Sequence, residues 1–578
     1  MALTETRPEK DATDDAGSSP AAGAAAGTAA PATVDSIIGT GDHKTIGRLF
    51  IGAGLIGLIG GLIVGIVATF QANNFDSPAA DAIDHLAQIW SLSRDLVMFG
   101  GLVPLLLGIA IYVVPLQIGA PSLAFARGAA AGLWTWFLGL GLLVLAYVFD
   151  GGPGGGDEDF IVLWASALAM MIGGLVWAMV CVATTILGAR TQGMTLERVP
   201  VTTWGFFVFS LVGIFSLPIV MGELLLAFLR VRYFHLPWDQ SASLTGILDG
   251  VSLAPAVYWL GIPGLAMGAD IIGVHSEEPV RAHKPVLVAI GLFGLLTYGA
   301  DVVGLASIRP VDFNNGFLVV GLFACVLPIL GVLGLSGQSI RTGTLNLRAA
   351  LIGVLLSGLL LLLAAIVALL ATVAPIMRWL DSVSPGSVDL SNSLVLNGTR
   401  FHEGLRALVV GSVIAAVIAA LHHWAPKIWG RRMAEPLGFV ALLATAAGSV
   451  IWAAGEIAAG FDDQPWLPAR ATDDFASGLA AISLIGVAVI AAGPVILGAN
   501  IATSFLGSKR AGSSPNVWSG TTLEWATASP PKPGNFPAPP IVRSATPLAD
   551  GDLLYVGMES EDEESGDTES GEKEESEG

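Results

Sequence analysis

The chain has very few cysteines and very few charged residues for its length. Two of its 578 residues are cysteines, Cys181 and Cys325, which excludes a disulfide framework and a cysteine-based metal cluster. Charged residues make up 13% of the chain, whereas soluble domains carry roughly 25%. This composition therefore excludes an ordinary water-soluble protein.

Basic residues are also scarce. There are 27 lysines and arginines against 47 aspartates and glutamates, a net charge of −20. Because binding to nucleic-acid phosphates needs a basic face, this balance argues against nucleic acid as a partner. An acidic surface is also suited to a high-salt, halophile-like environment, where dissolved ions screen the repulsion between carboxylates. That habitat is a hypothesis.

Both ends of the chain differ from its middle. Residues 1–40 are rich in Ala, Gly, Pro and Thr, and residues 559–578 contain eleven acids and one lysine. Neither composition supports a packed core, and a block of like charges repels itself. We therefore expect a disordered tail over 1–40, a membrane domain over 41–507, a C-terminal segment over 508–550 and an acidic disordered tail over 551–578.

Long hydrophobic runs dominate the middle of the chain. Hydrophobic residues make up 53% of the sequence, and the mean hydropathy is +0.71. A run of about 20 apolar residues crosses a ~30 Å hydrocarbon layer as a helix, and lipid requires every backbone polar group to be paired within the segment. We predict an all-α integral membrane protein, a twelve-helix transmembrane bundle. Its predicted spans are 46–70, 95–118, 131–149, 160–187, 202–230, 252–274, 283–308, 314–336, 346–377, 403–424, 436–461 and 475–506.

The loops predict the orientation of this bundle. Those that follow even-numbered spans hold ten basic residues, and those on the opposite side hold six together with many acids, such as Asp157-Glu158-Asp159. Loops with excess lysine and arginine stay in the cytoplasm. We therefore expect a multi-pass protein of the cell membrane with both termini cytoplasmic.

Several motifs resemble one family. Pro115-Leu116-Gln117-Ile118-Gly119-Ala120-Pro121 resembles the loop after the second helix of haem–copper oxidase subunit I. Thr521-Thr522-Leu523-Glu524-Trp525-Ala526-Thr527 resembles that family's cytoplasmic C-terminal segment, and His423-Trp424 agrees with the end of its tenth helix. The resemblance extends over about 40–540. It implies the twelve-helix fold of cytochrome c oxidase subunit I and partners such as a subunit II-like protein or a catalytic subunit I.

The resemblance also implies two haems and a copper ion, held by six histidines. Imidazole suits this task because its neutral nitrogen binds iron and copper. Each of the six positions carries another residue in this chain. These are Ser93, Ala254, Ala300, Asp301, Glu403 and Leu405.

Two further residues bear on this comparison. Tyr258 is retained at a position where many family members link a tyrosine to a copper ligand, although a tyrosine packed on a helix is the more ordinary interpretation. His402 stands one residue before Glu403 and is only a weak candidate haem ligand, since a histidine at the surface end of the span is the much better explanation. We therefore predict no cofactor and no metal.

Ionisable residues occupy several of the predicted spans. A charge in lipid is costly, so such groups normally pair inside a bundle. One hypothesis is that Arg94 and Arg406 pair with acids and replace the cofactors as ionic cross-links; the alternative is that these side chains reach water at the helix ends. The set comprises Arg94, Asp95, Glu223, Asp270, Asp301, Glu403, Arg406 and Glu456.

Three functions remain open at this point. The first is a non-catalytic, subunit I-like membrane protein of the aerobic respiratory chain with a structural or assembly role. The second is an active terminal oxidase or nitric oxide reductase that couples electron transfer to proton pumping. The third is an ion- or proton-conducting protein that uses Glu223, Asp270 and Asp301 along a polar path. We expect the first, because the ligand residues that the second requires are missing.

Overall fold

The computed structural model describes residues 38–73, 85–234, 256–306, 312–373, 399–465, 473–506, 515–551 and 553–556, with a few isolated positions between them. For 256–257, 298–306, 312–324 and 371–372 only the backbone is described. The tails that we expect to be disordered, 1–40 and 551–578, lie almost wholly outside these residues.

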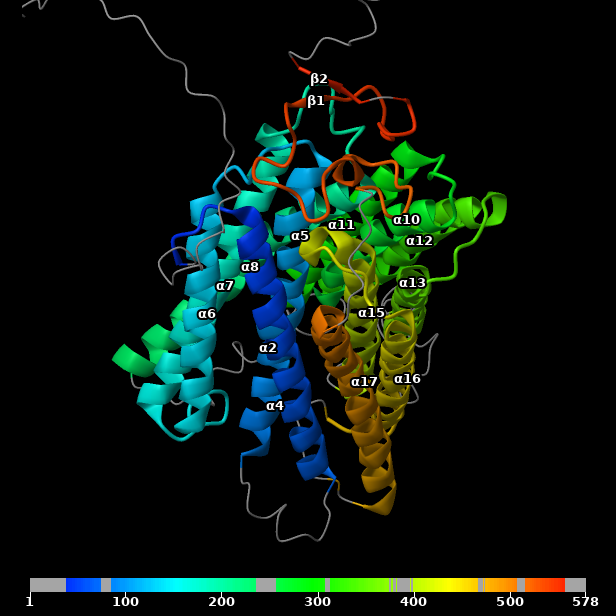
Figure 1. The fold of residues 1–578 in the computed structure, drawn as a ribbon. Helices are drawn as coiled ribbons and strands as arrows, with labels where there is room; N and C mark the ends of the chain where they lie inside the picture. The colour runs from blue at the N-terminus through cyan, green and yellow to red at the C-terminus, as the bar shows by residue number, and fades with distance from the viewer. Residues whose placement is uncertain are drawn as a thin grey trace, which may run out of the picture.

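Helices stand at all twelve predicted spans, and the predicted all-α membrane bundle is confirmed (Figure 1). Ten of the helices in the described part of the chain are long and apolar enough to cross a membrane. The first six spans are α2 (His43–Ala72), the continuous run of α4 (Leu86–Asp95), η1 (Leu96–Leu102) and α5 (Val103–Gln117), α6 (Ala126–Val148), α7 (Glu158–Gly188), α8 (Val201–Phe234) and η3 (Ala256–Leu260) with α10 (Gly261–His275). The others are α11 (His283–Ala306), α12 (Asp312–Thr342), α13 (Ala349–Ala368) with η4 (Leu369–Thr372), α15 (Phe401–Trp429), α16 (Glu435–Phe461) and α17 (Asp474–Leu506).

Two segments form the centre of the bundle. The membrane-spanning stretches of Leu86–Gln117 and Phe401–Trp429 are completely buried, whereas in most other helices only about half of the residues are buried. A helix that is apolar on all sides is expected to be buried in this way. These central segments also carry Ser93 and Glu403, so the predicted ligand positions of the second and tenth helices lie inside the protein.

Glycines bring α2 into backbone contact with η1, a single stretch of π-helix. A Cβ atom on Gly57 would stand 2.1 Å from the carbonyl oxygen of Gly100, a distance that no side chain tolerates. A Cβ atom on Gly101 would likewise stand 2.7 Å from the Cα of Leu58. The two helices therefore touch with no side chain between them, as small residues permit in membrane proteins.

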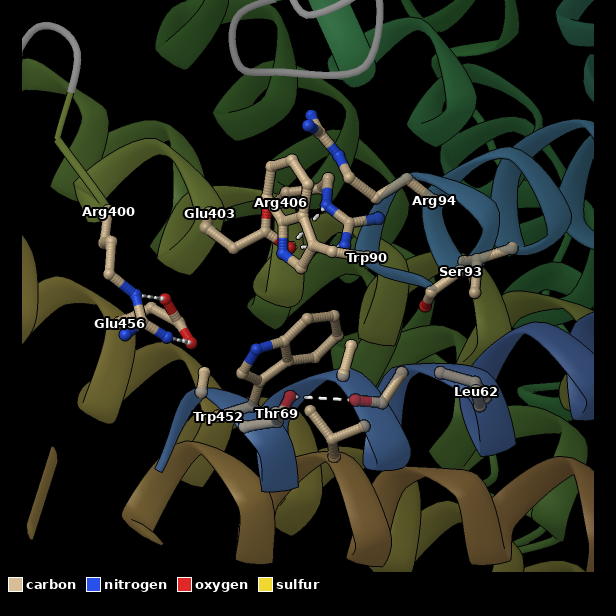
Figure 2. A pocket seen from close by; sticks show the side chains of 15 residues that line it. Leu62, Thr69, Trp90, Ser93, Arg94, Arg400, Glu403, Arg406, Trp452 and Glu456 are labelled. Carbon is tan, nitrogen blue, oxygen red and sulfur yellow. Dashed lines mark hydrogen bonds and ion pairs between the residues drawn. The ribbon is translucent and has the colours of Figure 1, made fainter. Parts of the chain in front are cut away.

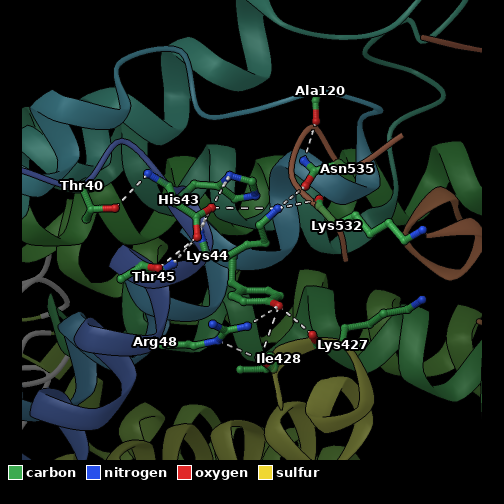
Figure 3. A network of polar contacts seen from close by, with 12 residues as sticks. Thr40, His43, Lys44, Thr45, Arg48, Ala120, Lys427, Ile428, Lys532 and Asn535 are labelled. Atoms are coloured by element: carbon green, nitrogen blue, oxygen red, sulfur yellow. Dashed lines mark hydrogen bonds and ion pairs between the residues drawn. The ribbon is translucent and has the colours of Figure 1, made fainter. Parts of the chain in front are cut away.

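The segment 515–551 covers one end of the bundle, which we call the capped end (Figure 1). Lys44, at the start of α2, donates from Nζ to the carbonyl oxygen of Lys532 at 2.9 Å and to Oδ1 of Asn535 at 3.0 Å (Figure 3). Lys427, near the end of α15, donates to the carbonyl oxygens of Pro515 and Thr527. Within this segment, β1 (Pro540–Ile541) pairs antiparallel with β2 (Leu554–Tyr555), which follows it.

Candidate functional site

A small cavity lies between the two central segments, near the end of the bundle opposite the capped end. Its volume is about 30 Å³, and it is lined by residues of α2, α4, η1, α15, α16 and α17 (Figure 2). Most of the polar lining comes from three arginines and two glutamates. These are Arg94, Arg400, Glu403, Arg406 and Glu456.

Two arginine–glutamate pairs close the cavity on the α15 side. Arg406 Nε donates to Glu403 Oε1 at 2.9 Å, within one turn of α15. Arg400 binds Glu456 of α16 with two hydrogen bonds, from Nε to Oε2 at 2.8 Å and from Nη2 to Oε1 at 2.7 Å. Such parallel, two-point contacts are the strongest form of the arginine–carboxylate interaction. The Arg406–Glu403 pair is buried, and in the other pair Glu456 is buried while Arg400 is 16% exposed.

Tryptophan rings pack against the arginines. The guanidinium carbon of Arg94 lies 4.2 Å from the ring centre of Trp90, and that of Arg406 lies 5.4 Å from the ring centre of Trp452. A cation over an indole face is stabilised by the ring quadrupole, more so away from water. Arg94, Glu403 and Arg406 are only 4–5% exposed. The arrangement in which these side chains reach water at the helix ends is therefore not the one found.

The predicted ligand positions do not all meet at this cavity. Ser93 lines it, and its hydroxyl donates to the carbonyl oxygen of Gly61 at 2.9 Å. Glu403 also lines it, but Leu405 and His402 do not; Arg406 stands there instead. Ala254 lies outside the described residues, as do the side chains of Ala300 and Asp301.

Three other predicted residues are held elsewhere in the bundle. Asp95 accepts hydrogen bonds from the Tyr147 hydroxyl at 3.0 Å and from Trp164 Nε1 at 3.4 Å. Asp270 accepts the backbone N–H of Thr202 at 2.8 Å and so caps the first turn of α8. Tyr258 is fully buried, and its hydroxyl donates to the carbonyl oxygen of Ala364 at 3.0 Å.

Glu223 differs from these residues. It lies on α8, away from the cavity, and its side chain is half-buried. Within the described part of the chain, no hydrogen bond or ion pair to Glu223 is found.

Arg400 was not anticipated from the sequence, where it counts only as a loop charge. The spacing of Arg400, Glu403 and Arg406 is the signal that could have found it. Residues three apart share one face of a helix, so these three side chains reach the same space. Trp90 and Trp452, which pack on the arginines, carry no comparable signal because tryptophan is common in membrane helices.

Residues 45–495 match the sequence profile of the family described as Cytochrome C and Quinol oxidase polypeptide I. The chain belongs to this family. Its relatives include cytochrome c oxidase subunit 1 of Bacillus subtilis (strain 168), which is 25% identical over 88% of this chain and 82% of the relative. Quinol oxidase subunit 1 of the same organism is 26% identical over 88% of this chain and 79% of that protein.

The fold agrees with this membership. A solved structure of a heme-copper terminal oxidase dimer superposes with a TM-score of 0.60 at 14% sequence identity, covering 81% of this chain and 84% of the other. The protein is thus a subunit I-like, multi-pass protein of the cell membrane. The resemblance drawn from the sequence motifs is confirmed.

The residues around the cavity do not fit a haem. A haem in this family is held by neutral imidazoles, whereas the cavity offers guanidinium groups, which have only donor hydrogens, and a Ser93 hydroxyl bound to α2. Glu403 keeps one carboxylate oxygen without a partner, but its other oxygen is bound to Arg406. A volume of about 30 Å³ holds one or two water molecules, far less than a porphyrin. In the described part of the chain, no three His, Cys, Asp or Glu side chains gather as metal ligands do.

Proposed function

We propose that this oxidase polypeptide I relative is a non-catalytic subunit of the aerobic respiratory chain, with a structural or assembly role. The observation that carries this proposal is the chemistry between α4–η1 and α15. Where the family resemblance implies imidazoles around a haem, this chain has two arginine–glutamate pairs and two tryptophan rings.

The ionic pairs offer a physical account of how the fold persists without a haem. An empty apolar cavity costs roughly 24 cal/mol for each Å³, so a space of haem size would destabilise the bundle severely. Here Arg406 and Trp452 fill the space, and Arg400 ties α15 to α16. Breaking a buried pair costs about 3–5 kcal/mol, which indicates how firmly such contacts hold neighbouring helices together.

A structural role requires partners. We propose that the protein assembles with other membrane-embedded oxidase subunits, such as a subunit II-like protein or a catalytic subunit I, with its capped end and both termini in the cytoplasm. The capped end supports this proposal because 515–551 is held there by Lys44 and Lys427. Because these lysines hold the segment 515–551 in place, its outer surface can contact neighbouring subunits.

The proposal is tested by the cofactor content of the protein in its native complex. The full chain is isolated from its own membranes in mild detergent, and haem is measured by visible absorption and copper by elemental analysis. Subunit 1 of Bacillus subtilis, prepared in the same way, serves as the positive control. We expect far less than one haem per chain, together with stoichiometric co-purifying subunits.

One haem or more per chain in the isolated complex would contradict the proposal. Because an accompanying catalytic subunit brings its own haem, the count is repeated after the chain is separated from its partners. Oxygen consumption by the chain alone, inhibited by cyanide, would favour the active-oxidase alternative.

A further inference from the structure

Among the acidic side chains inside the bundle that the structure describes, all but one have a polar partner. Asp95 is bound by Tyr147, Asp270 caps α8, and Glu403 and Glu456 are paired with arginines. Glu223 has no hydrogen bond or ion pair within the described part of the chain. We propose that the half of α8 away from the capped end docks a transmembrane helix of another polypeptide, which places a lysine or arginine beside Glu223.

Glu223 lies at a depth in the membrane where a carboxylate needs a polar partner. At 1.5 Å per residue, the helix Val201–Phe234 is about 50 Å long, and Glu223 lies about 16 Å from its Phe234 end. Because α8 is longer than the hydrocarbon layer, this position falls inside the membrane. A carboxylate at that depth is costly without a partner, and the side chain is only half-buried by its own protein.

The surface beside Glu223 has the character of a helix-docking face. Phe215, Ile219, Leu226 and Tyr233 recur at helical spacing and are 61%, 40%, 43% and 66% exposed. Gly222 lies in the middle of this stripe, and a Cβ atom there would meet nothing within 4 Å. A glycine on an exposed face lets a second helix approach closely, and polar groups then pair across the contact.

The opposite face of the same half-helix is occupied. Val220, Leu224 and Ala227 are almost fully buried, and the Met221 side chain lies against Gly173 of α7. At its end, Arg232 reaches Asp159 of α7, with 3.6 Å between Nη1 and Oδ1. The helix is therefore fixed to its own bundle on one side and presents Glu223 at the edge of the free side.

Charge complementarity decides between the occupants of this face. Lipid tails cover apolar residues but offer no donor to a carboxylate. A second copy in a two-fold contact would bring Glu223 against its own equivalent, like charge against like charge. Residues 235–255, which follow α8, contain no lysine or arginine. A partner helix with a basic side chain would cover the exposed apolar stripe and would also pair with the Glu223 carboxylate.

Site-specific photo-cross-linking in the native membrane tests this surface. A photoreactive phenylalanine analogue replaces Leu226 in the full chain, and the control probe replaces Leu443 of α16, which is 69% exposed. We expect the Leu226 probe to give one protein adduct whose linked peptide is a membrane span with a lysine or arginine. The Leu443 probe should not give this adduct.

Substitutions of Glu223 make the test specific for charge. Glu223→Lys should lower the adduct yield at least tenfold, Glu223→Gln should lower it severalfold, and the matched control Leu443→Lys should leave it unchanged. Exchanging the partner's basic residue for glutamate should restore the adduct with Glu223→Lys. Thermal unfolding of each variant shows that the chain still folds, and Glu223→Gln remains informative if the lysine variant does not insert.

Three results would overturn the inference. They are an adduct yield that is indifferent to Glu223→Lys and Glu223→Gln, adducts with lipid alone, and adducts with a second copy of this chain alone. The inference rests on the proposed assembly with a partner but does not depend on the absence of haem. A failure of the haem analysis would therefore contradict the non-catalytic function, whereas a failure of the cross-linking would contradict only the docking face.

Discussion

Arg400 and Glu456 join the N-cap of α15 to the last turns of α16 through two parallel hydrogen bonds of 2.8 and 2.7 Å. The glutamate is 3% exposed and the arginine 16%, so water screens this pair little. Together with Arg406 and Glu403, it places formal charges around the cavity in the membrane part of a protein whose family resemblance implies histidine ligands to haem.

Removing one member of this pair should destabilise the protein strongly. Glu456→Ala leaves the Arg400 guanidinium buried without its counter-charge, and we expect a loss of about 3–5 kcal/mol in the free energy of unfolding. The double variant Arg400→Met/Glu456→Leu should lose much less, because no charge is left behind. Thermal unfolding in detergent measures both; equal losses would show that the charge contributes nothing.

Introducing imidazoles at the cavity should not produce a haem protein. In Ser93→His/Arg406→His two potential axial ligands face the cavity, but a Cβ atom on Gly65 of α2 would already stand 2.8 Å from the Ser93 hydroxyl. The helices leave no room for a porphyrin, so we expect no haem absorption after expression with added haem. The appearance of a Soret band would show that the bundle opens more readily than its packing indicates.

The contact between α2 and η1 predicts a sharp dependence on side-chain size. Gly57→Ala places a methyl group against the carbonyl oxygen of Gly100, and separating the helices should cost about 1–3 kcal/mol. Gly60→Ala is the matched control, since a Cβ atom there meets nothing within 4 Å. A difference of less than about 0.5 kcal/mol between the two variants would contradict the close contact.

The contribution of Glu524 to docking of the segment 515–551 should weaken as the pH rises. Burial raises the pKa of Glu524 above its ordinary value, and the nearby Asp270 adds to this shift. At Glu524 the docked state therefore binds more protons than the released state, so the stability that a neutral Glu524 contributes is present at low pH. That stability is lost as the pH climbs from the ordinary value through the raised one.

Hydrogen exchange across 515–551, measured from pH 5 to 9 and corrected for intrinsic rates, checks this dependence. Glu524→Gln should remove the part of the pH dependence that comes from Glu524, because the amide cannot ionise, while Gln117 remains able to donate to it. Glu197→Gln is the control, since Glu197 is exposed and its pKa is lowered by Lys284. An unchanged profile in Glu524→Gln would assign the dependence to other groups.

The sequence was sufficient for the bundle but not for its interior. Runs of apolar residues located all twelve helices because lipid imposes one length and one backbone pattern on each span. Helix ends were less accurate: α15 begins at Phe401 and not at 403, and Arg400, which counted as a loop residue, is the N-cap directly before the helix. Its position at the helix end lets the Arg400 side chain line the cavity.

Partners across the bundle were beyond the reach of sequence reasoning for a geometric reason. A count along the tenth span placed Leu405 at a ligand position, yet Glu403 and Arg406 face the cavity, because helix rotation is set by packing against other helices. The pairing of Arg406 with Glu403 follows from their spacing, whereas the pairing of Arg400 with Glu456 joins two helices and leaves no local signature.

The covering of the capped end imposes an order on biosynthesis. Lys44 belongs to the first span to leave the ribosome and Lys427 to the tenth, but both find their acceptors in residues translated after the last span. A nascent chain must hold these two ammonium groups in water until synthesis is nearly finished. Closure of that end thus reports that insertion is complete, and a chain truncated before Pro515 would present two unsatisfied lysines to the quality-control machinery.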